Sequence, residues 1–152
     1  MKKSETKKHK PYSIEDEEAP KLSEPSFTMQ PIHRIPAALK DFPFSKFKKI
    51  ADKVPFTQTE WANILHLSER TLQRYAKDNK SFEGIYVDRI LQLEKLINEG
   101  LETFTDADTF YRWLKRDKSV LGNELSFEAL YHSEGIQQVF DELGRIQHGI
   151  YI

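Results

Sequence analysis

The chain has 152 residues, of which 31% are charged and 38% hydrophobic, and its formal net charge is −1. This composition indicates one or two small water-soluble domains, because no apolar run approaches the roughly 20 residues that a membrane-spanning helix needs. The absence of cysteine excludes disulfides and thiolate metal sites and fits a cytoplasmic protein. The basic start "MKKSETKKHK" lacks the apolar stretch of a secretory signal.

Charge is unevenly distributed along the chain. Residues 40–80 carry nine Lys or Arg against five Asp or Glu, whereas residues 100–152 carry five against nine. A basic segment followed by an acidic segment suggests two tasks on one chain, with random scatter of charge as the alternative explanation.

Residues 1–36 are predicted to form a flexible or extended N-terminal tail. They are rich in proline, contain the acidic run "EDEE" at 15–18 and have little apolar content. Such a segment buries too little surface to offset the entropy lost on ordering. Its few apolar residues, Phe27, Ile32 and Ile35, offer a way to dock on a neighbouring copy.

From Phe42 onward, apolar residues recur with helical spacing. Residues 44–54 place them on one face, with lysines elsewhere. Thr57 followed by Glu60 is a capping box that predicts a second helix, and Ser68 is the expected N-cap of a third. Two short helices about three residues apart describe a helix-turn-helix. His66 occupies the turn position where a glycine in the left-handed conformation is common.

The third helix has two chemically different faces. Leu72, Tyr75 and Ala76 lie on one side and are expected to pack on the preceding helix. The opposite side is rich in Arg, Gln and Lys, which suits DNA because these side chains bind guanine, adenine and phosphates. An ordinary solvated helix face is the alternative. The predicted DNA-binding residues are Ser68, Glu69, Arg70, Thr71, Gln73, Arg74 and Lys77.

The second half of the chain also follows a helical pattern. The longest helix is predicted from Ser81, as its cap, to Gly100. Apolar residues cover more than one of its faces, so it should join the two halves or lie in a dimer interface. The other expected elements are a helix at 105–116 capped by Thr105 or Asp106, a loop at 120–127, a short helical turn at 126–132 and a last helix at 133–149 that stops at Gly149. Strand patterns are absent, and the fold class expected is all-α.

No catalytic, cofactor-binding or metal-binding constellation is recognised. The histidines lack the spacing of a zinc ligand set, and the glycines form no phosphate-binding loop. The carboxylate pairs Asp106/Asp108 and Asp141/Glu142 fit helix caps and solvated charges better than an acid–base dyad. The chain is therefore not expected to be an enzyme.

Over residues 42–152 the chain resembles the Xre/MbcA/ParS-like antitoxins, which pair with RES-domain toxins. The first half matches at "LSERTLQRY" (67–75) and at Asp88, Arg89, Ile90 and Leu91. The second half matches at Ala107, Trp113, Leu114, Leu121, Gly122, Glu134, Gly135, Val139, Leu143, Arg145, Ile146 and Gly149. It departs from the family where Gly122-Asn123 replaces a Gly-Gly pair, where Ser126 replaces proline and where His148 replaces an aromatic residue.

The resemblance implies a bacterial type II antitoxin that acts in the cytoplasm. Residues 37–100 would form an Xre-like helix-turn-helix domain that binds the operator of the antitoxin's own operon. Residues 101–152 would form a helical domain that binds a toxin which consumes NAD or uses it for ADP-ribosylation. From the resemblance and from the apolar chain end together, the expected toxin-binding residues are Trp113, Leu121, Gly122, Arg145, His148, Gly149, Ile150, Tyr151 and Ile152.

The last three residues, Ile150, Tyr151 and Ile152, are apolar and follow a helix stop. An apolar end is unusual unless something covers it, so this tail is expected either to enter a cleft of the toxin or to fold back on its own domain. A homodimer is expected to read two half-sites, with the helix at 82–99 as part of the dimer contact. The alternative function is a helix-turn-helix transcriptional regulator without a toxin partner.

Overall fold

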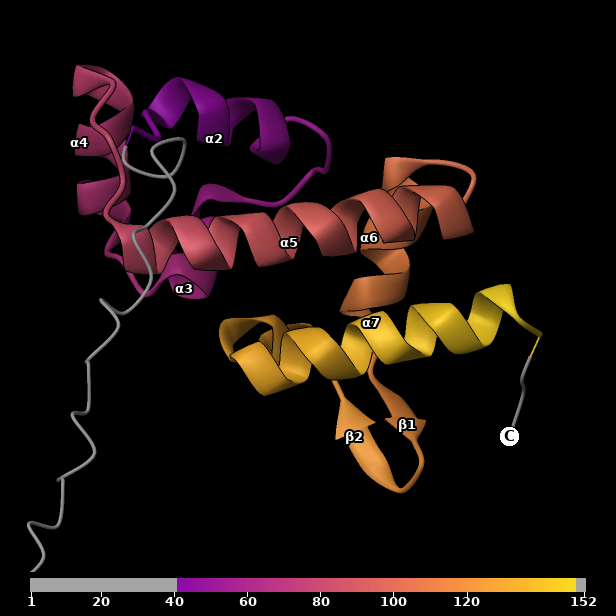
Figure 1. The fold of residues 1–152 in the computed structure, drawn as a ribbon. Coiled ribbons are helices and arrows are strands. Elements are labelled where there is room, and N and C mark those ends of the chain that lie inside the picture. The colour runs from indigo at the N-terminus through magenta and orange to yellow at the C-terminus, as the bar shows by residue number, and fades with distance from the viewer. Residues whose placement is uncertain (1–40, 150–152) are drawn as a thin grey trace, which may run out of the picture. The chain divides into compact units, whose positions relative to one another are not determined.

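The computed structural model describes residues 41–149, which belong to one compact unit (Figure 1). Six α-helices, a short 3-10 helix and a two-stranded sheet make up this part of the chain. Their bounds are α2 Phe44–Ala51, α3 Gln58–Leu65, α4 Glu69–Asp78, α5 Gly84–Thr103, α6 Ala107–Lys115, β1 Lys118–Val120, β2 Asn123–Leu125, η1 Phe127–Tyr131 and α7 Ser133–Gln147. The mainly helical fold expected from the sequence is confirmed.

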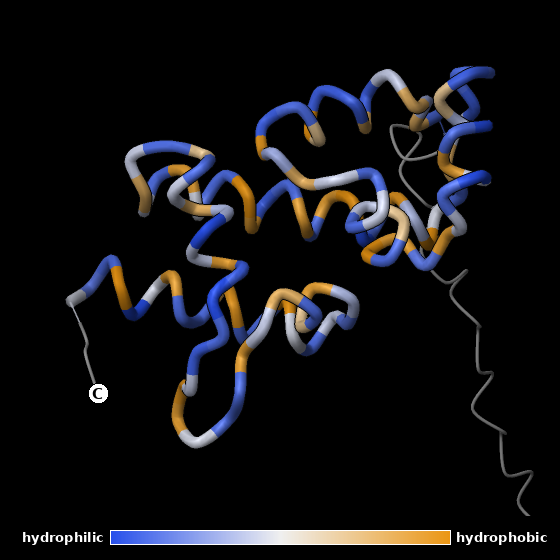
Figure 2. Tube along the Cα trace, turned by 180° about the vertical axis from the view of Figure 1, so that it is seen from behind, coloured by the Kyte–Doolittle hydropathy of each residue, from blue (hydrophilic) through white to orange (hydrophobic). Residues whose placement is uncertain are grey.

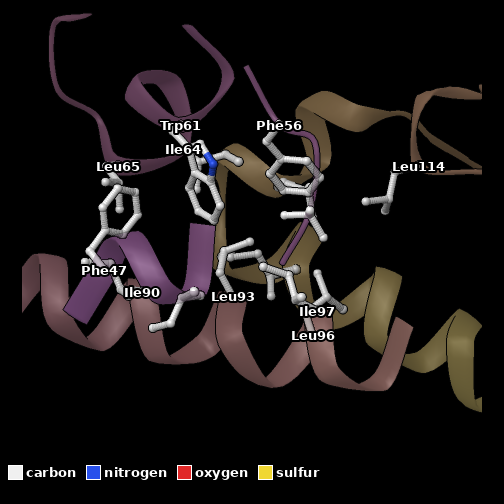
Figure 3. Close-up of a cluster of buried hydrophobic side chains, with 14 of the residues drawn as sticks. Phe47, Phe56, Trp61, Ile64, Leu65, Ile90, Leu93, Leu96, Ile97 and Leu114 are labelled. Carbon is white, nitrogen blue, oxygen red and sulfur yellow. The ribbon is translucent and has the colours of Figure 1, made fainter. Parts of the chain in front are cut away.

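Helix α5 is the 20-residue spine of this unit (Figure 1). Its apolar positions recur along the helix between polar ones, as the colouring of Figure 2 shows, and α3, α6 and α7 all contact it. In Figure 3, Trp61 and Ile64 of α3 face Ile90 and Leu93 of α5 across a shared core. The prediction that the long helix joins the two halves of the chain is confirmed.

Side-chain caps mark the start of three of the six α-helices in the described residues. Thr57 and Glu60 form the reciprocal capping box at α3, in which the Glu60 amide donates to the Thr57 hydroxyl over 3.1 Å. Ser68 caps α4, and Asp106 rather than Thr105 caps α6 by accepting from the Thr109 amide over 2.7 Å.

The ends of α5 differ from the sequence prediction. Ser81 does not cap it: its hydroxyl donates to Asp41, its backbone bridges Pro43, and α5 starts three residues later. Gly100 does not stop it either, because the helix continues to Thr103. Gly100 is buried against the ring of Phe110, which lies where a Cβ atom would be, so this glycine allows close packing of α6 rather than ending a helix.

Residues 120–127 are not simply a loop, and the prediction that no strand occurs is wrong at this point. Lys118 pairs with Leu125, Ser119 with Glu124 and Val120 with Asn123 in an antiparallel hairpin. Each strand has three residues, and only Leu125 among them is buried. A strand this short cannot display the apolar alternation by which strands are recognised in a sequence.

Helical length and hydropathy also bear on membrane insertion. Among residues 41–149, no helix combines the length and the apolar character that crossing a bilayer requires.

Candidate nucleic-acid and protein interfaces

The connection between α3 and α4 is a tight turn of three residues, 66–68. His66 has a φ of 55° and so adopts the left-handed conformation that the sequence placed at this position. The Leu67 amide donates to the Ala62 carbonyl over 2.9 Å, which closes the end of α3. Ala62 is 2% exposed, and its small side chain lets the two helices cross closely.

The inner face of α4 is narrower than predicted. Leu72 and Tyr75 are buried, and the ring of Tyr75 lies 4.8 Å from that of Phe82. Ala76, which was expected to share this face, is exposed. A 10-residue helix that packs through two residues leaves most of its surface to solvent or to a ligand.

The outer face of α4 is cationic and open. Arg70, Gln73, Arg74 and Lys77 are all exposed and, together with Thr71, line one surface hollow. Within the described part of the chain, none of these four makes a side-chain hydrogen bond or an ion pair. Their donors are therefore available to an acceptor from outside, and base edges and phosphate oxygens are such acceptors.

The remaining members of the predicted DNA-binding set are engaged within the chain. The Ser68 hydroxyl donates to the Thr71 hydroxyl over 2.8 Å and accepts from the Thr71 amide over 3.1 Å, as an N-cap does. The Glu69 carboxylate accepts from the Thr59 hydroxyl over 2.8 Å and so ties the start of α4 to the start of α3. These three residues orient the helix, whereas the side chains of the four on the outer face have no hydrogen-bond partner among residues 41–149.

A polar junction connects the turn of the helix-turn-helix to the second half of the chain. The carbonyl of Tyr131, at the end of η1, lies 2.7 Å from Nε2 of His66 and accepts from Nη1 of Arg89 over 3.1 Å. Arg89 also donates to the hydroxyl of Ser133. The sequence carries no signal of this junction, because His66 and Tyr131 are 65 positions apart.

A second junction forms around the one buried acidic side chain of the described residues, Glu60. Its Oε1 accepts from the Tyr111 hydroxyl and from Lys115 Nζ, each over 2.9 Å, and its Oε2 accepts from the Thr57 amide over 2.9 Å. Burial raises the pKa of Glu60, but the hydrogen bonds from Lys115, Thr57 and Tyr111 outweigh it and hold this pKa below its usual value. The capping glutamate of α3 therefore also connects α3 to α6 through these hydrogen bonds.

The hairpin and α7 enclose a small groove. Leu121 at the tip, Leu125 of β2, and Asp141 and Arg145 of α7 line a cavity of about 100 Å³. The Arg145 guanidinium pairs with Glu142 over 2.7 Å on the same helix. Leu121 and Arg145 of the predicted toxin-binding set thus lie on one surface. Val120, Asn123 and Gln138 complete the groove, and the sequence analysis missed them because their contact depends on the hairpin.

The other predicted toxin-binding residues lie in different places. Trp113 is half-buried, with Phe104 at 5.3 Å between ring centroids and Lys118 Nζ 4.2 Å above its ring, and it does not line the groove. Gly122 is exposed at the hairpin tip. His148 and Gly149 are exposed at the end of α7, where Gly149 has a φ of 67°. Residues 150–152 lie outside the described residues.

Two family models match the chain. Residues 33–95 match an antitoxin Xre-like helix-turn-helix domain. Residues 100–149 match the antitoxin Xre/MbcA/ParS C-terminal toxin-binding domain. No curated protein matches the chain. The cationic face of α4 lies in the first matched segment, and the groove between the hairpin and α7 lies in the second.

Proposed function

Because the chain belongs to the Xre/MbcA/ParS antitoxin family, with a helix-turn-helix domain and a toxin-binding domain, we propose that it neutralises a RES-domain toxin by direct binding and represses its own operon. The toxin consumes NAD or uses it for ADP-ribosylation, and the antitoxin supplies no chemistry of its own. Both partners of this chain, operator DNA and newly made toxin, are found in the cytoplasm.

The DNA-binding arm of the proposal is carried by the outer face of α4. Four exposed side chains there offer hydrogen-bond donors, and three of the four are cations. The single acceptor among their polar groups is the amide oxygen of Gln73. Arg70 and Arg74 suit guanine, Gln73 suits adenine and Lys77 suits a phosphate. The buried inner face and the cap at Ser68 hold this helix in one orientation, which a sequence-specific contact requires.

The toxin-binding arm rests on the second matched segment, and we assign it two contact regions. One is the surface around the groove, with Leu121, Gly122 and Arg145. The other is the end of α7, with His148, Gly149 and the apolar residues Ile150, Tyr151 and Ile152, which we expect to enter the cleft of the toxin. Trp113, packed against Phe104, supports the domain that presents these regions.

We further propose that the antitoxin acts as a homodimer within a larger assembly, because one helix-turn-helix covers too little DNA for tight specific binding. Most of α5 is covered by α3, α6 and α7. Ile85, near its start, is 75% exposed and is the residue of α5 that we expect at the dimer contact.

The experiment that tests this function is co-expression of the chain with the RES-domain toxin encoded beside it. Mass measurement of the purified complex shows whether the two proteins bind and in what ratio. NAD consumption by the toxin should stop when the antitoxin is added, and a chain that ends at Gly149 should lose this effect while still shifting operator DNA.

The outcomes separate the parts of the proposal. If no complex forms, NAD consumption is unaffected and the DNA still shifts, the chain is a transcriptional regulator without a toxin partner. If the complex forms and DNA is not shifted, autoregulation by the α4 surface is wrong. Full inhibition by the truncated chain would refute the role of residues 150–152.

A further inference from the structure

The tip of the hairpin holds a leucine in a conformation that leucine disfavours. Val120 pairs with Asn123, so Leu121 and Gly122 form a two-residue turn. Their φ angles are 50° and 82°, and positive values at both positions define a type I′ turn. Asn-Gly is the pair that such a turn prefers, because the Cβ of other L-residues crowds the backbone in the left-handed region.

The leucine side chain buries only a minor part of its surface in return. Leu121 is 63% exposed, and Ile85 is the other large apolar side chain that the described residues leave in water. A single exposed leucine is common on protein surfaces and needs no explanation by itself. An exposed leucine at a position with an unfavourable backbone conformation is different, because an asparagine would suit both the turn and the solvent.

The position of Leu121 points to a partner protein. The hairpin projects from the side of α7 that faces away from α5, as both Figure 1 and Figure 2 show. Leu121 forms the rim of the groove lined by Asp141 and Arg145, and it lies within the segment matched as toxin-binding. The paired strands on both sides of the two-residue turn restrict the backbone at Leu121, so little backbone entropy is lost when a partner covers it.

We propose that Leu121 is an anchor that inserts into an apolar pocket on the surface of the RES-domain toxin. This inference rests on the proposed function and deepens it: within the groove surface, which is separate from the C-terminal residues 150–152, Leu121 supplies the apolar contact. The strained turn is retained because it presents the leucine to the toxin, at the expense of the stability of the free antitoxin.

The test uses the full-length chain, the purified RES-domain toxin and three variants. Leu121→Asn removes the apolar side chain and creates the preferred Asn-Gly turn, so it should raise the melting temperature of the free antitoxin by roughly 2–6 °C. The same variant should weaken toxin binding about 30-fold in calorimetry or a sensor assay, since a buried leucine is lost. Leu121→Met keeps an apolar side chain and should stay within about threefold of the original affinity. Ser119→Asn places the same amide on the exposed face of the same hairpin and should change neither property.

A gain in melting temperature together with a loss of toxin affinity, seen for Leu121→Asn alone, is the expected signature. Unchanged toxin affinity in Leu121→Asn would overturn the anchor, and an unchanged or lower melting temperature would overturn the strain argument. An equal loss of toxin affinity in Ser119→Asn would also overturn the anchor role of Leu121, because the effect would then belong to the whole hairpin. Failure of the unaltered chain to bind the toxin would overturn the proposed function and this inference together.

Discussion

Replacing Glu60 by glutamine tests the hydrogen bonds that connect the helix-turn-helix to α6 in the second half of the chain. The carboxylate accepts from Lys115 and Tyr111 of α6 and from the Thr57 amide. A glutamine has one acceptor oxygen instead of two, so Glu60→Gln loses either the capping bond or the bond from Lys115. The Tyr111 hydroxyl can reorient to accept from the new amide, but the Lys115 ammonium cannot.

The expected loss of unfolding free energy follows from how exposed the Glu60 and Lys115 side chains are. A hydrogen bond to a buried charged group contributes about 1.5–3 kcal/mol, and the Glu60 side chain is only 10% exposed. The Lys115 side chain is 45% exposed, and solvent screening reduces its share to about 0.5–1 kcal/mol. We therefore expect Glu60→Gln to lower the free energy of unfolding by about 1–2 kcal/mol.

The effect of pH has a definite sign. Since the pKa of Glu60 is lowered in the folded state, its ionised form stabilises the fold at any pH above the unfolded value of 4.5. This contribution is lost as the pH falls through the lower, folded-state pKa. The stability difference between the original chain and Glu60→Gln should accordingly be constant near pH 7 and shrink below about pH 4.5.

Urea unfolding of both proteins at several pH values measures these differences. The matched control is Glu94→Gln, because Glu94 pairs with Lys53 over 3.4 Å where both side chains are about one-third exposed. That variant should cost less than about 0.5 kcal/mol. If Glu60→Gln is no more destabilising than Glu94→Gln, or if its effect does not shrink in acid, the hydrogen bonds of Glu60 do not stabilise the fold as described.

Three further substitutions test other parts of the structure. Gly135→Ala should destabilise the chain by about 3 kcal/mol, because the added Cβ would overlap the rigid backbone of Ala129; a loss below 1 kcal/mol in urea unfolding would contradict this packing. Arg89→Met removes the donor to the Tyr131 carbonyl and should lower the unfolding free energy by about 1 kcal/mol, whereas an unchanged urea midpoint would argue against that bond. Arg74→Ala should lower operator affinity by roughly 1–3 kcal/mol in a gel-shift titration at moderate salt without affecting toxin binding; undiminished affinity would exclude a base contact.

Local signals in the sequence were enough to predict where α3 and α4 begin. Thr57 with Glu60 predicted the start of α3, Ser68 predicted the start of α4, and both caps form. The polar stripe at Arg70 and Arg74 was predicted to face outward, and both side chains are exposed. These features depend on residues within about one turn of one another, so they can be read without knowledge of the fold.

The features that connect the two halves were decided by tertiary structure. Glu60 meets Lys115 across 55 positions, and His66 and Arg89 share the carbonyl of Tyr131. The strained position of Leu121 appears only once two three-residue strands pair. The partners of Glu60 and of Tyr131 are brought together because both halves pack on one long helix, and no spacing or periodicity in the sequence records which residues that packing places in contact.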